Sequence, residues 1–173
     1  MTTPSEKSLL EQLAAELNQT KEQVEQLTLE LKEAKANLQQ LVYRDGLSGL
    51  YNHRYFQEMI NKELERSLRY SSPFSLVIFD LDAFAQVNET YGHQSGDLIL
   101  MNIARVVERE VRPSDIVARY GGEEFAIILP ETDFPGLNLL SGRLCQSIRE
   151  MATLVDDEEI KATVCLGAVT FVP

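Results

Sequence analysis

The chain has 173 residues and a net charge of -11, and 44% of its residues are apolar. This length accommodates one ordinary domain with an appendage, and the negative charge excludes general binding to nucleic acid or anionic membrane. The first ten residues lack the features of a signal peptide, and no apolar run approaches the ~20 residues that span a bilayer. We therefore expect a soluble, cytoplasmic chain without a membrane segment. Cys145 and Cys165 form no CxxC pair, and we expect both to be small core residues.

Residues 5–42 contain neither Pro nor Gly, and their apolar residues repeat every seven positions, which predicts a coiled coil. The a positions are Leu10, Leu17, Val24, Leu31 and Leu38, and the d positions are Leu13, Thr20, Leu27, Ala34 and Leu41. Glu16 and Glu30 at g positions precede Lys21 and Lys35 at the following e positions, a spacing typical of parallel dimers. Residues 1–43 are thus predicted to be a parallel dimerisation helix. The alternatives are a solvated amphipathic helix or one that packs on another domain.

Residues 44–173 alternate between helix-like and strand-like stretches, which predicts an α/β domain. We expect helices at 55–70, 98–111 and 137–151, the second capped by Asp97, and strands at 74–79, 116–120, 125–129 and 162–171. Gly121 and Gly122 predict a hairpin between the second and third strands.

Two pairs of acidic residues flank predicted strands. Asp80 and Asp82 follow the apolar strand at 74–79, and Glu123 and Glu124 follow the glycines of the hairpin. If the two strands are neighbours, three or four carboxylates converge at one end of the sheet. All-oxygen ligands without His or Cys favour Mg²⁺ or a similar hard cation that shares substrate phosphates. The alternative is that these acids mark only strand ends and an exposed turn.

The stretch from Asn88 to Asp97 contains two glycines and is predicted to be a loop that leads into a helix. A carboxylate can accept the N1 and N2 hydrogens of guanine, while an amide can bond another edge of the purine. These two residues are therefore candidates for guanine recognition, the alternative being helix capping and turn formation.

Four segments together resemble the signature motifs of the GGDEF family of diguanylate cyclases, in order and in spacing. They are Asp45-Gly-Leu-Ser-Gly-Leu-Tyr-Asn-His-Arg54, Phe79-Asp-Leu-Asp-Ala-Phe84, Asn88 through Asp97, and Gly121-Gly-Glu-Glu-Phe125, a GGEEF variant. The resemblance runs from about residue 43 to residue 172. It implies an α/β (α+β) fold similar to nucleotidyl cyclases and polymerase palms, with a central, mostly antiparallel sheet flanked by helices.

The resemblance also implies a reaction in which two domains, each with one bound GTP, form cyclic di-GMP and two pyrophosphates. By motif position, Asp80, Glu124 and the Leu81 carbonyl would hold Mg²⁺ or Mn²⁺, and Glu123 would act at the reacting centre. The remaining positions would bind substrate: Asn88 and Asp97 would read guanine, and Gly121 and Gly122 would admit the phosphates. The coiled coil would then raise the effective concentration of the two domains.

Arg112 and Asp115 resemble the RxxD site at which the family binds its product, with Arg143 as a second basic contact. Arginine suits a bidentate grip on phosphate and stacking on guanine. Cyclic di-GMP is thus expected both as product and as inhibitor, and the alternative is a surface ion pair.

The sequence departs from the family pattern in two places. Ala85 stands where a phosphate-contacting lysine is usual, and the family normally continues beyond the strand at 162–171 through a further helix and strand, so we expect a truncated domain. These departures leave two other functions open, a non-catalytic cyclic di-GMP receptor and a coiled-coil signalling scaffold.

Overall fold

The computed structural model describes residues 17–32, 35 and 42–173, and the chain divides into two compact units, Met1–Val42 and Tyr43–Pro173. In the first unit, residues 17–32 are helical and leave four residues of the predicted stripe more than half exposed: Leu17, Val24, Leu27 and Leu31. An apolar stripe of this kind is the surface that a partner helix covers in a coiled coil. Other predicted heptad residues lie outside the described residues: Leu10, Leu13, Glu16, Ala34, Leu38 and Leu41.

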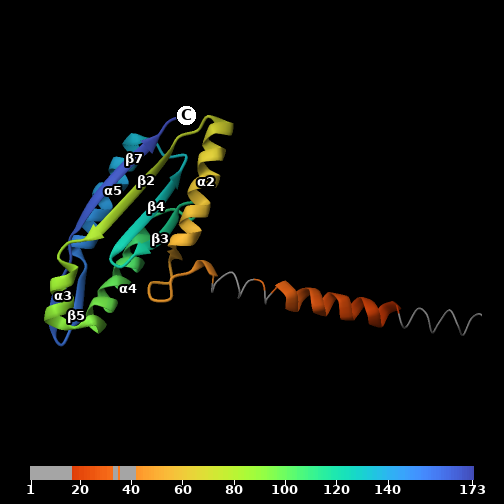
Figure 1. Cartoon of the computed structure of the whole chain (residues 1–173), viewed down its shortest axis with the longest axis horizontal. Coiled ribbons are helices and arrows are strands. Elements are labelled where there is room, and N and C mark those ends of the chain that lie inside the picture. Colours follow the sequence, from red (N-terminus) through yellow and green to blue (C-terminus); the bar gives the residue numbers. More distant parts are fainter. Residues whose placement is uncertain (1–16, 33–34, 36–41) are drawn as a thin grey trace, which may run out of the picture. The chain divides into compact units, whose positions relative to one another are not determined.

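The second unit is built around a five-stranded sheet (Figure 1). Its elements in chain order are β1 (Tyr51–Asn52), α2 (His53–Tyr70), β2 (Phe74–Leu81), α3 (Phe84–Tyr91), α4 (His93–Glu110), β3 (Ile116–Gly121), β4 (Glu124–Pro130), α5 (Phe134–Glu150), β5 (Ala152–Val155), β6 (Glu158–Lys161) and β7 (Val164–Phe171). The strand order is β1-β3-β4-β2-β7, and β5 and β6 form a separate two-stranded sheet. Only β1 and β3 are parallel within the five-stranded sheet. The predicted mostly antiparallel sheet is confirmed.

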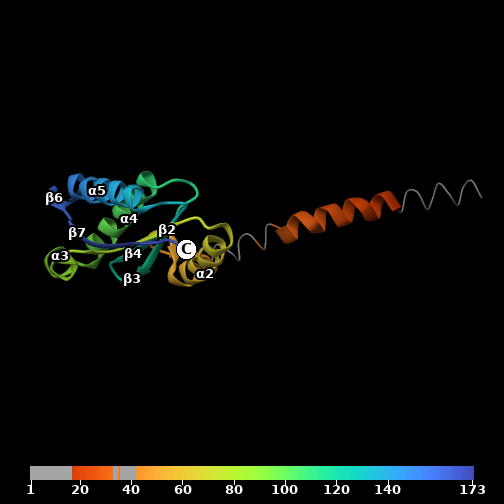
Figure 2. The same cartoon turned by 90° about the horizontal axis from the view of Figure 1, so that it is seen from above.

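Helices cover both faces of the sheet, α4 and α5 on one face and α2 on the other (Figure 2). Because side chains alternate across a strand, β2 contributes to two separate apolar clusters. Val77 and Phe79 pack into the larger cluster with residues of α4 and α5, while Phe74 joins Phe56 of α2 in the smaller one. Phe79 stacks on Phe125 of β4, with ring centroids 5.1 Å apart. The strands that carry the acidic residues are therefore fixed by burial on both sides.

Local signals fix the ends of two predicted helices. The Asn52 side chain caps α2 by accepting a hydrogen bond from the Tyr55 N–H, and Asp133 caps α5 through the Gly136 N–H. The predicted strands correspond to β2, β3, β4 and β7. None of the helices in the described part of the chain combines the length and apolar character needed to cross a bilayer.

The segment between Asn88 and Asp97 differs from the prediction. It is not a loop, because Asn88 lies within α3 and Asp97 within α4, with Gly92 alone between the helices. Asp97 does not cap α4, which begins four residues earlier at His93; Gly92 is the N-cap, with a φ of 81° that favours glycine. α3 has only eight residues and buries one of them, Phe84, so it offers no long apolar period from which it could be predicted.

The two cysteines are not both core residues, so that prediction is wrong. Cys165 is exposed on β7, and Cys145 is half-buried on α5. Cys165 lies directly opposite Asp80 in the sheet. A hydrogen bond to the Asp82 carboxylate, followed by the charge of that carboxylate, raises the pKa of the Cys165 thiol.

Candidate active site

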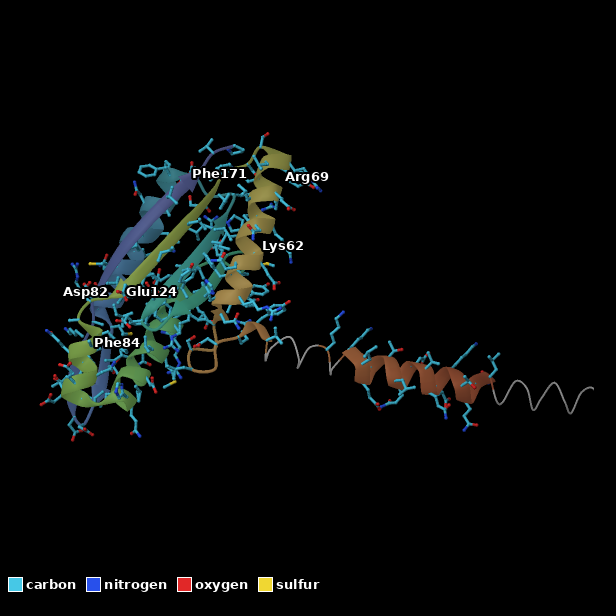
Figure 3. The ribbon with its side chains drawn as sticks, viewed as in Figure 1. Lys62, Arg69, Asp82, Phe84, Glu124 and Phe171 are labelled. Carbon is cyan, nitrogen blue, oxygen red and sulfur yellow. The ribbon has the colours of Figure 1, made fainter. Side chains whose placement is uncertain are left out.

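The acidic ends of β2 and β4 lie side by side. Antiparallel pairing places Asp80 directly opposite Glu124, and opposed residues of this kind point to the same face, with Cβ atoms about 5 Å apart. Both side chains are exposed. Figure 3 shows Asp82 and Glu124 at the same end of the sheet, near Phe84 at the start of α3. The condition on which convergence of the acidic residues depends, that the two strands are neighbours, is therefore met.

Asp82 forms hydrogen bonds with residues in and next to β7, and it does not complete a metal-binding cluster with Asp80 and Glu124. A hydrogen bond from the Cys165 thiol, with a second from the Thr163 hydroxyl at 2.6 Å, lowers the pKa of Asp82. The Asp82 N–H also donates to the Thr163 carbonyl. Across the residues that the structure describes, no three His, Cys, Asp or Glu side chains form a metal-binding cluster. Asp80, Asp82 and Glu124 thus lie at one end of the sheet, but in the described part of the chain they do not form a three-carboxylate metal cluster.

The donor set nevertheless fits a hard cation. Within the described ranges, no Lys or Arg forms an ion pair with Asp80, Glu123 or Glu124. Leu81, the last residue of β2, buries its side chain, so its main-chain carbonyl is the group it can offer. Mg²⁺ binds proteins through one or two carboxylates and keeps its other positions for water and substrate phosphates. Two opposed carboxylates suit that arrangement.

The turn between β3 and β4 consists of Gly122 and the half-buried Glu123. Gly122 has a φ of 34°, in the region that favours glycine, and Gly121 is the last residue of β3. Both glycines are exposed, and a side chain added to Gly122 would meet nothing within 4 Å. The turn therefore leaves its main chain open to an approaching phosphate.

Arg119 holds this turn in place. Its Nε and Nη2 atoms donate to the Gly122 carbonyl at 2.9 and 2.7 Å, and its Nη1 atom donates to Asp45 at 3.2 Å. The register of β3 and β4 shifts between Arg119 and Gly121, which marks an irregularity just before the turn. Arg119 thus links the glycine turn to the segment that precedes β1.

Asp45 is the anion that orients Arg119. Burial raises the pKa of Asp45, but hydrogen bonds from the hydroxyl and N–H of Ser48 and from Arg119 outweigh it and hold this pKa below its ordinary value. Sequence analysis assigned no role to either partner, because 74 positions separate them. The available signals were the place of Asp45 in the first motif and that of Arg119 beside the glycines.

The predicted guanine-reading residues lie on two packed helices. The Asn88 side chain of α3 contacts Gly96 of α4, the residue that precedes Asp97. Asn88 is half-buried, and its Oδ1 atom is buried and has no hydrogen-bond partner in the structure, whereas Asp97 is exposed. The two side chains are thus carried by a rigid helix pair.

The three predicted product-site residues line one cavity of about 110 Å³ between α4, β4 and α5. Arg112 and Asp115 close a turn, because the Arg112 N–H donates to the Asp115 carboxylate at 2.8 Å and the Asp115 N–H donates to the Arg112 carbonyl at 3.0 Å. Arg143 reaches the same cavity from α5.

Arg143 is already paired with Glu110 at the end of α4. Its guanidinium donates both to the Glu110 carboxylate and to the Glu110 carbonyl. A hydrogen bond from the Ser147 hydroxyl, together with this guanidinium, lowers the pKa of Glu110. A phosphate ligand of Arg143 would therefore compete with Glu110.

A model of the family described as "Diguanylate cyclase, GGDEF domain" matches residues 42–173. The chain is similar to Diguanylate cyclase DosC of Escherichia coli (strain K12), with 34% identity over 129 residues, which are 73% of this chain. It is also similar to Probable diguanylate cyclase DgcC of the same strain, with 37% identity over 89 residues, or 51% of this chain. The chain spans 28% and 24% of the lengths of these two relatives.

Two solved structures share this fold. Diguanylate cyclase SiaD of Pseudomonas aeruginosa, solved in complex with its activator SiaC, has a TM-score of 0.78 and 32% identity; the similarity covers 96% of this chain and 64% of that chain. The coiled coil and GGDEF domain of DgcB from Caulobacter crescentus, in complex with c-di-GMP, has a TM-score of 0.77 and 25% identity, covering 93% of this chain and 84% of that chain.

Proposed function

The chain belongs to the GGDEF family of diguanylate cyclases, and on this premise we propose that it condenses two GTP molecules into cyclic di-GMP and two pyrophosphates. In each of two equivalent steps, the 3′-hydroxyl oxygen of one GTP bonds to the α-phosphorus of the other. The bond from that phosphorus to the bridging oxygen breaks, pyrophosphate leaves, and the hydroxyl proton passes to Glu123 or to solvent. The GTP for this reaction is available in the cytoplasm, where we propose that the domain works.

The proposal rests on the pairing of Asp80 with Glu124 beside an open glycine turn. In the described chain, neither carboxylate has a Lys or Arg ion-pair partner. These carboxylates and the Leu81 carbonyl would hold Mg²⁺ or Mn²⁺. When bound, such a cation would neutralise phosphate charge, including that of the leaving pyrophosphate. Glu123, in the turn itself, would assist deprotonation of the attacking hydroxyl.

The protein would position its substrates through the neighbouring helices and the turn. Asn88 and Asp97 would bond the guanine, and Gly121 and Gly122 would let the phosphates lie against the main chain. Because positioning supplies much of the acceleration in phosphoryl transfer, the fixed α3–α4 pair and the turn held by Arg119 suit this chemistry.

Each domain contributes one GTP, so the reaction requires two copies of the chain. The exposed apolar stripe of residues 17–32 supports a parallel coiled-coil dimer that would keep two domains at high effective concentration. The cavity that Arg112, Asp115 and Arg143 line supports feedback inhibition by cyclic di-GMP. Within this proposal, residues 1–43 serve dimerisation and residues 44–173 serve catalysis.

Substitution of the carboxylate pair tests the proposed cation site. With GTP and a Mg²⁺ titration, Asp80→Asn should require more Mg²⁺ and form much less cyclic di-GMP, and excess EDTA should stop synthesis by the native protein. The matched control is Asp157→Asn, at an exposed position in the β5–β6 turn. It should leave the Mg²⁺ requirement and the formation of cyclic di-GMP unchanged. Equal synthesis by Asp80→Asn and native protein, at every Mg²⁺ concentration, would refute the site.

The second candidate function is a receptor that binds cyclic di-GMP without making it. The cavity at Arg112 favours it, and so does Ala85, which supplies no cation for a triphosphate. A receptor would bind cyclic di-GMP and form no product from GTP with either metal ion. Its binding would be lost in Arg112→Ala and unaffected in Asp80→Asn.

A further inference from the structure

The α3 and α4 helices pack against each other at Gly96, a buried residue that is the fourth of α4. A Cβ atom added to Gly96 would lie 2.0 Å from Oδ1 and 3.1 Å from Cγ of Asn88. Real Cβ atoms do not approach another atom as closely as 2.0 Å, so the absence of a side chain at Gly96 provides the space that the Asn88 amide fills. Glycine is less favourable than alanine inside a helix, so glycine at position 96 lowers the stability of α4. A role of the contact with Asn88 would explain why glycine stands there.

No hydrogen bond holds this end of the Asn88 amide. Oδ1 is buried and without a hydrogen-bond partner in the part of the chain that the structure describes. Rotating the amide by half a turn exchanges its oxygen and nitrogen but keeps one of them against Gly96, and Cγ does not move. The position of the amide is therefore set by the shape of the space, not by bonding.

We infer that Gly96 is a positioning residue for nucleotide recognition, because it holds the Asn88 amide in the orientation that selects guanine. The inference rests on the proposed function for the identity of the nucleotide. Alanine at this position would displace the amide, because Asn88 can rotate away from a new methyl group while the main chain of α4 cannot. The expected result is a folded protein with impaired selection of guanine.

A competing explanation is that Gly96 serves only the packing of the two helices. The ring of Phe84 supports it, because its Cζ atom would lie 3.1 Å from the added Cβ. Packing alone would lower stability and all ligand binding together, regardless of the side chain at residue 88. A double-mutant cycle with Asn88→Ala separates the two explanations, because alanine at 88 removes the amide but leaves Phe84 in place.

Calorimetric binding provides the first readout, with a GTP analogue whose α–β bridge is methylene, in Mg²⁺, and the matching ATP analogue. Gly96→Ala should weaken binding of the GTP analogue about tenfold, like Asn88→Ala, with little effect on the ATP analogue. The double variant should bind the GTP analogue no more weakly than Asn88→Ala alone. Gly142→Ala is the matched control, because Gly142 also lies inside a helix but has nothing within 4 Å of its added Cβ.

Thermal unfolding provides a second readout that needs no nucleotide. Gly96→Ala should lower the unfolding midpoint by about 5 °C in the native background and by clearly less in the Asn88→Ala background. The double variant also keeps the test available if Gly96→Ala alone fails to fold. Gly142→Ala should leave the midpoint unchanged or raise it.

Two results would overturn the inference. One is an affinity of Gly96→Ala for the GTP analogue equal to that of the native protein. The other is that Gly96→Ala lowers the affinity and the unfolding midpoint by the same amounts in the native and in the Asn88→Ala background. If the native protein bound neither analogue, the proposed function would fail and the guanine assignment with it. The unfolding cycle would still decide whether Gly96 holds the Asn88 side chain.

Discussion

Two regions of the domain carry charged residues suited to phosphate chemistry, and they hold them differently. Where β2 ends and β4 begins, Asp80 and Glu124 face each other, and no Lys or Arg of the described chain pairs with them. In the cavity between α4 and α5, Arg143 is bound to Glu110. The first region needs an external cation, whereas a ligand at the second must displace an internal partner. This difference fits the roles that we propose, turnover at the first region and product binding in competition with Glu110 at the second.

The largest expected effect is on the rate of cyclic di-GMP formation, and it concerns only the first region, where Asp80 faces Glu124. Glu123→Gln should lower the rate of cyclic di-GMP formation by about a thousandfold, because it removes the proposed general base, and should leave cyclic di-GMP binding unchanged. Chromatography of products and calorimetry with cyclic di-GMP measure the two quantities. Glu65→Gln, at an exposed position of α2, is the control. Simultaneous loss of synthesis and product binding would show that the two regions are not independent.

The converse change concerns the second region. Arg112→Ala should raise the inhibitory concentration of cyclic di-GMP by about tenfold to a hundredfold, because it removes a charged phosphate contact, and should leave the initial rate unchanged. Initial rates at increasing cyclic di-GMP concentration measure this. Arg105→Ala on α4 provides a control for the loss of positive charge. If cyclic di-GMP inhibited Arg112→Ala as strongly as the native protein, this cavity would not be the site of product inhibition.

A smaller change tests the internal competitor. Glu110→Gln weakens the partner of Arg143 and should lower the inhibitory concentration of cyclic di-GMP by about threefold, the size expected from an exposed ion pair. The same inhibition assay measures it, with Glu65→Gln on α2, an exposed position, as the control. A higher inhibitory concentration in Glu110→Gln would mean that Glu110 supports the ligand and does not compete with it.

The smallest effect concerns the support of the glycine turn. Because the pKa of Asp45 is lowered on folding, its pairing with Arg119 stabilises the fold fully above the unfolded-state value of about 3.9 and less as the pH falls through the folded-state value. Asp45→Asn should therefore lower the unfolding midpoint by about 3 °C at pH 7 and by little near pH 3. A pH-independent difference would contradict this assignment of charge. Asp133→Asn keeps a capping side chain and is the control.

The parts of the fold that could be predicted are those fixed by local signals. The apolar run at 74–79 and the two glycines at 121 and 122 predicted β2 and the hairpin, because burial and turn geometry act within a few residues. The β5–β6 hairpin was missed because each strand has only four residues and β6 carries two glutamates, which are depleted in strands. The sheet register that brings Asp80 opposite Glu124 required the three-dimensional structure.

The candidate site was also predicted only in part, because local patterns identify residue types but not long-range contacts. Residue types and motif spacing identified Asp80, Glu123 and Glu124, but the hydrogen bond from Thr163, just before β7, to Asp82 spans 81 positions and depends on the pairing of β2 with β7. The contact between Asn88 and Gly96 depends on α3 being a helix, which a segment of eight residues is too short to signal by periodicity. Long-range partners such as these decide which acidic residues remain open to a ligand.

We propose that two copies of this chain make cyclic di-GMP from GTP. The most direct test is to incubate the native protein with GTP and Mg²⁺ at several protein concentrations and to separate the products by chromatography. The account predicts cyclic di-GMP, at a rate that rises faster than linearly with protein concentration until the dimer is fully formed. Absence of cyclic di-GMP at every concentration, with either Mg²⁺ or Mn²⁺, would contradict it.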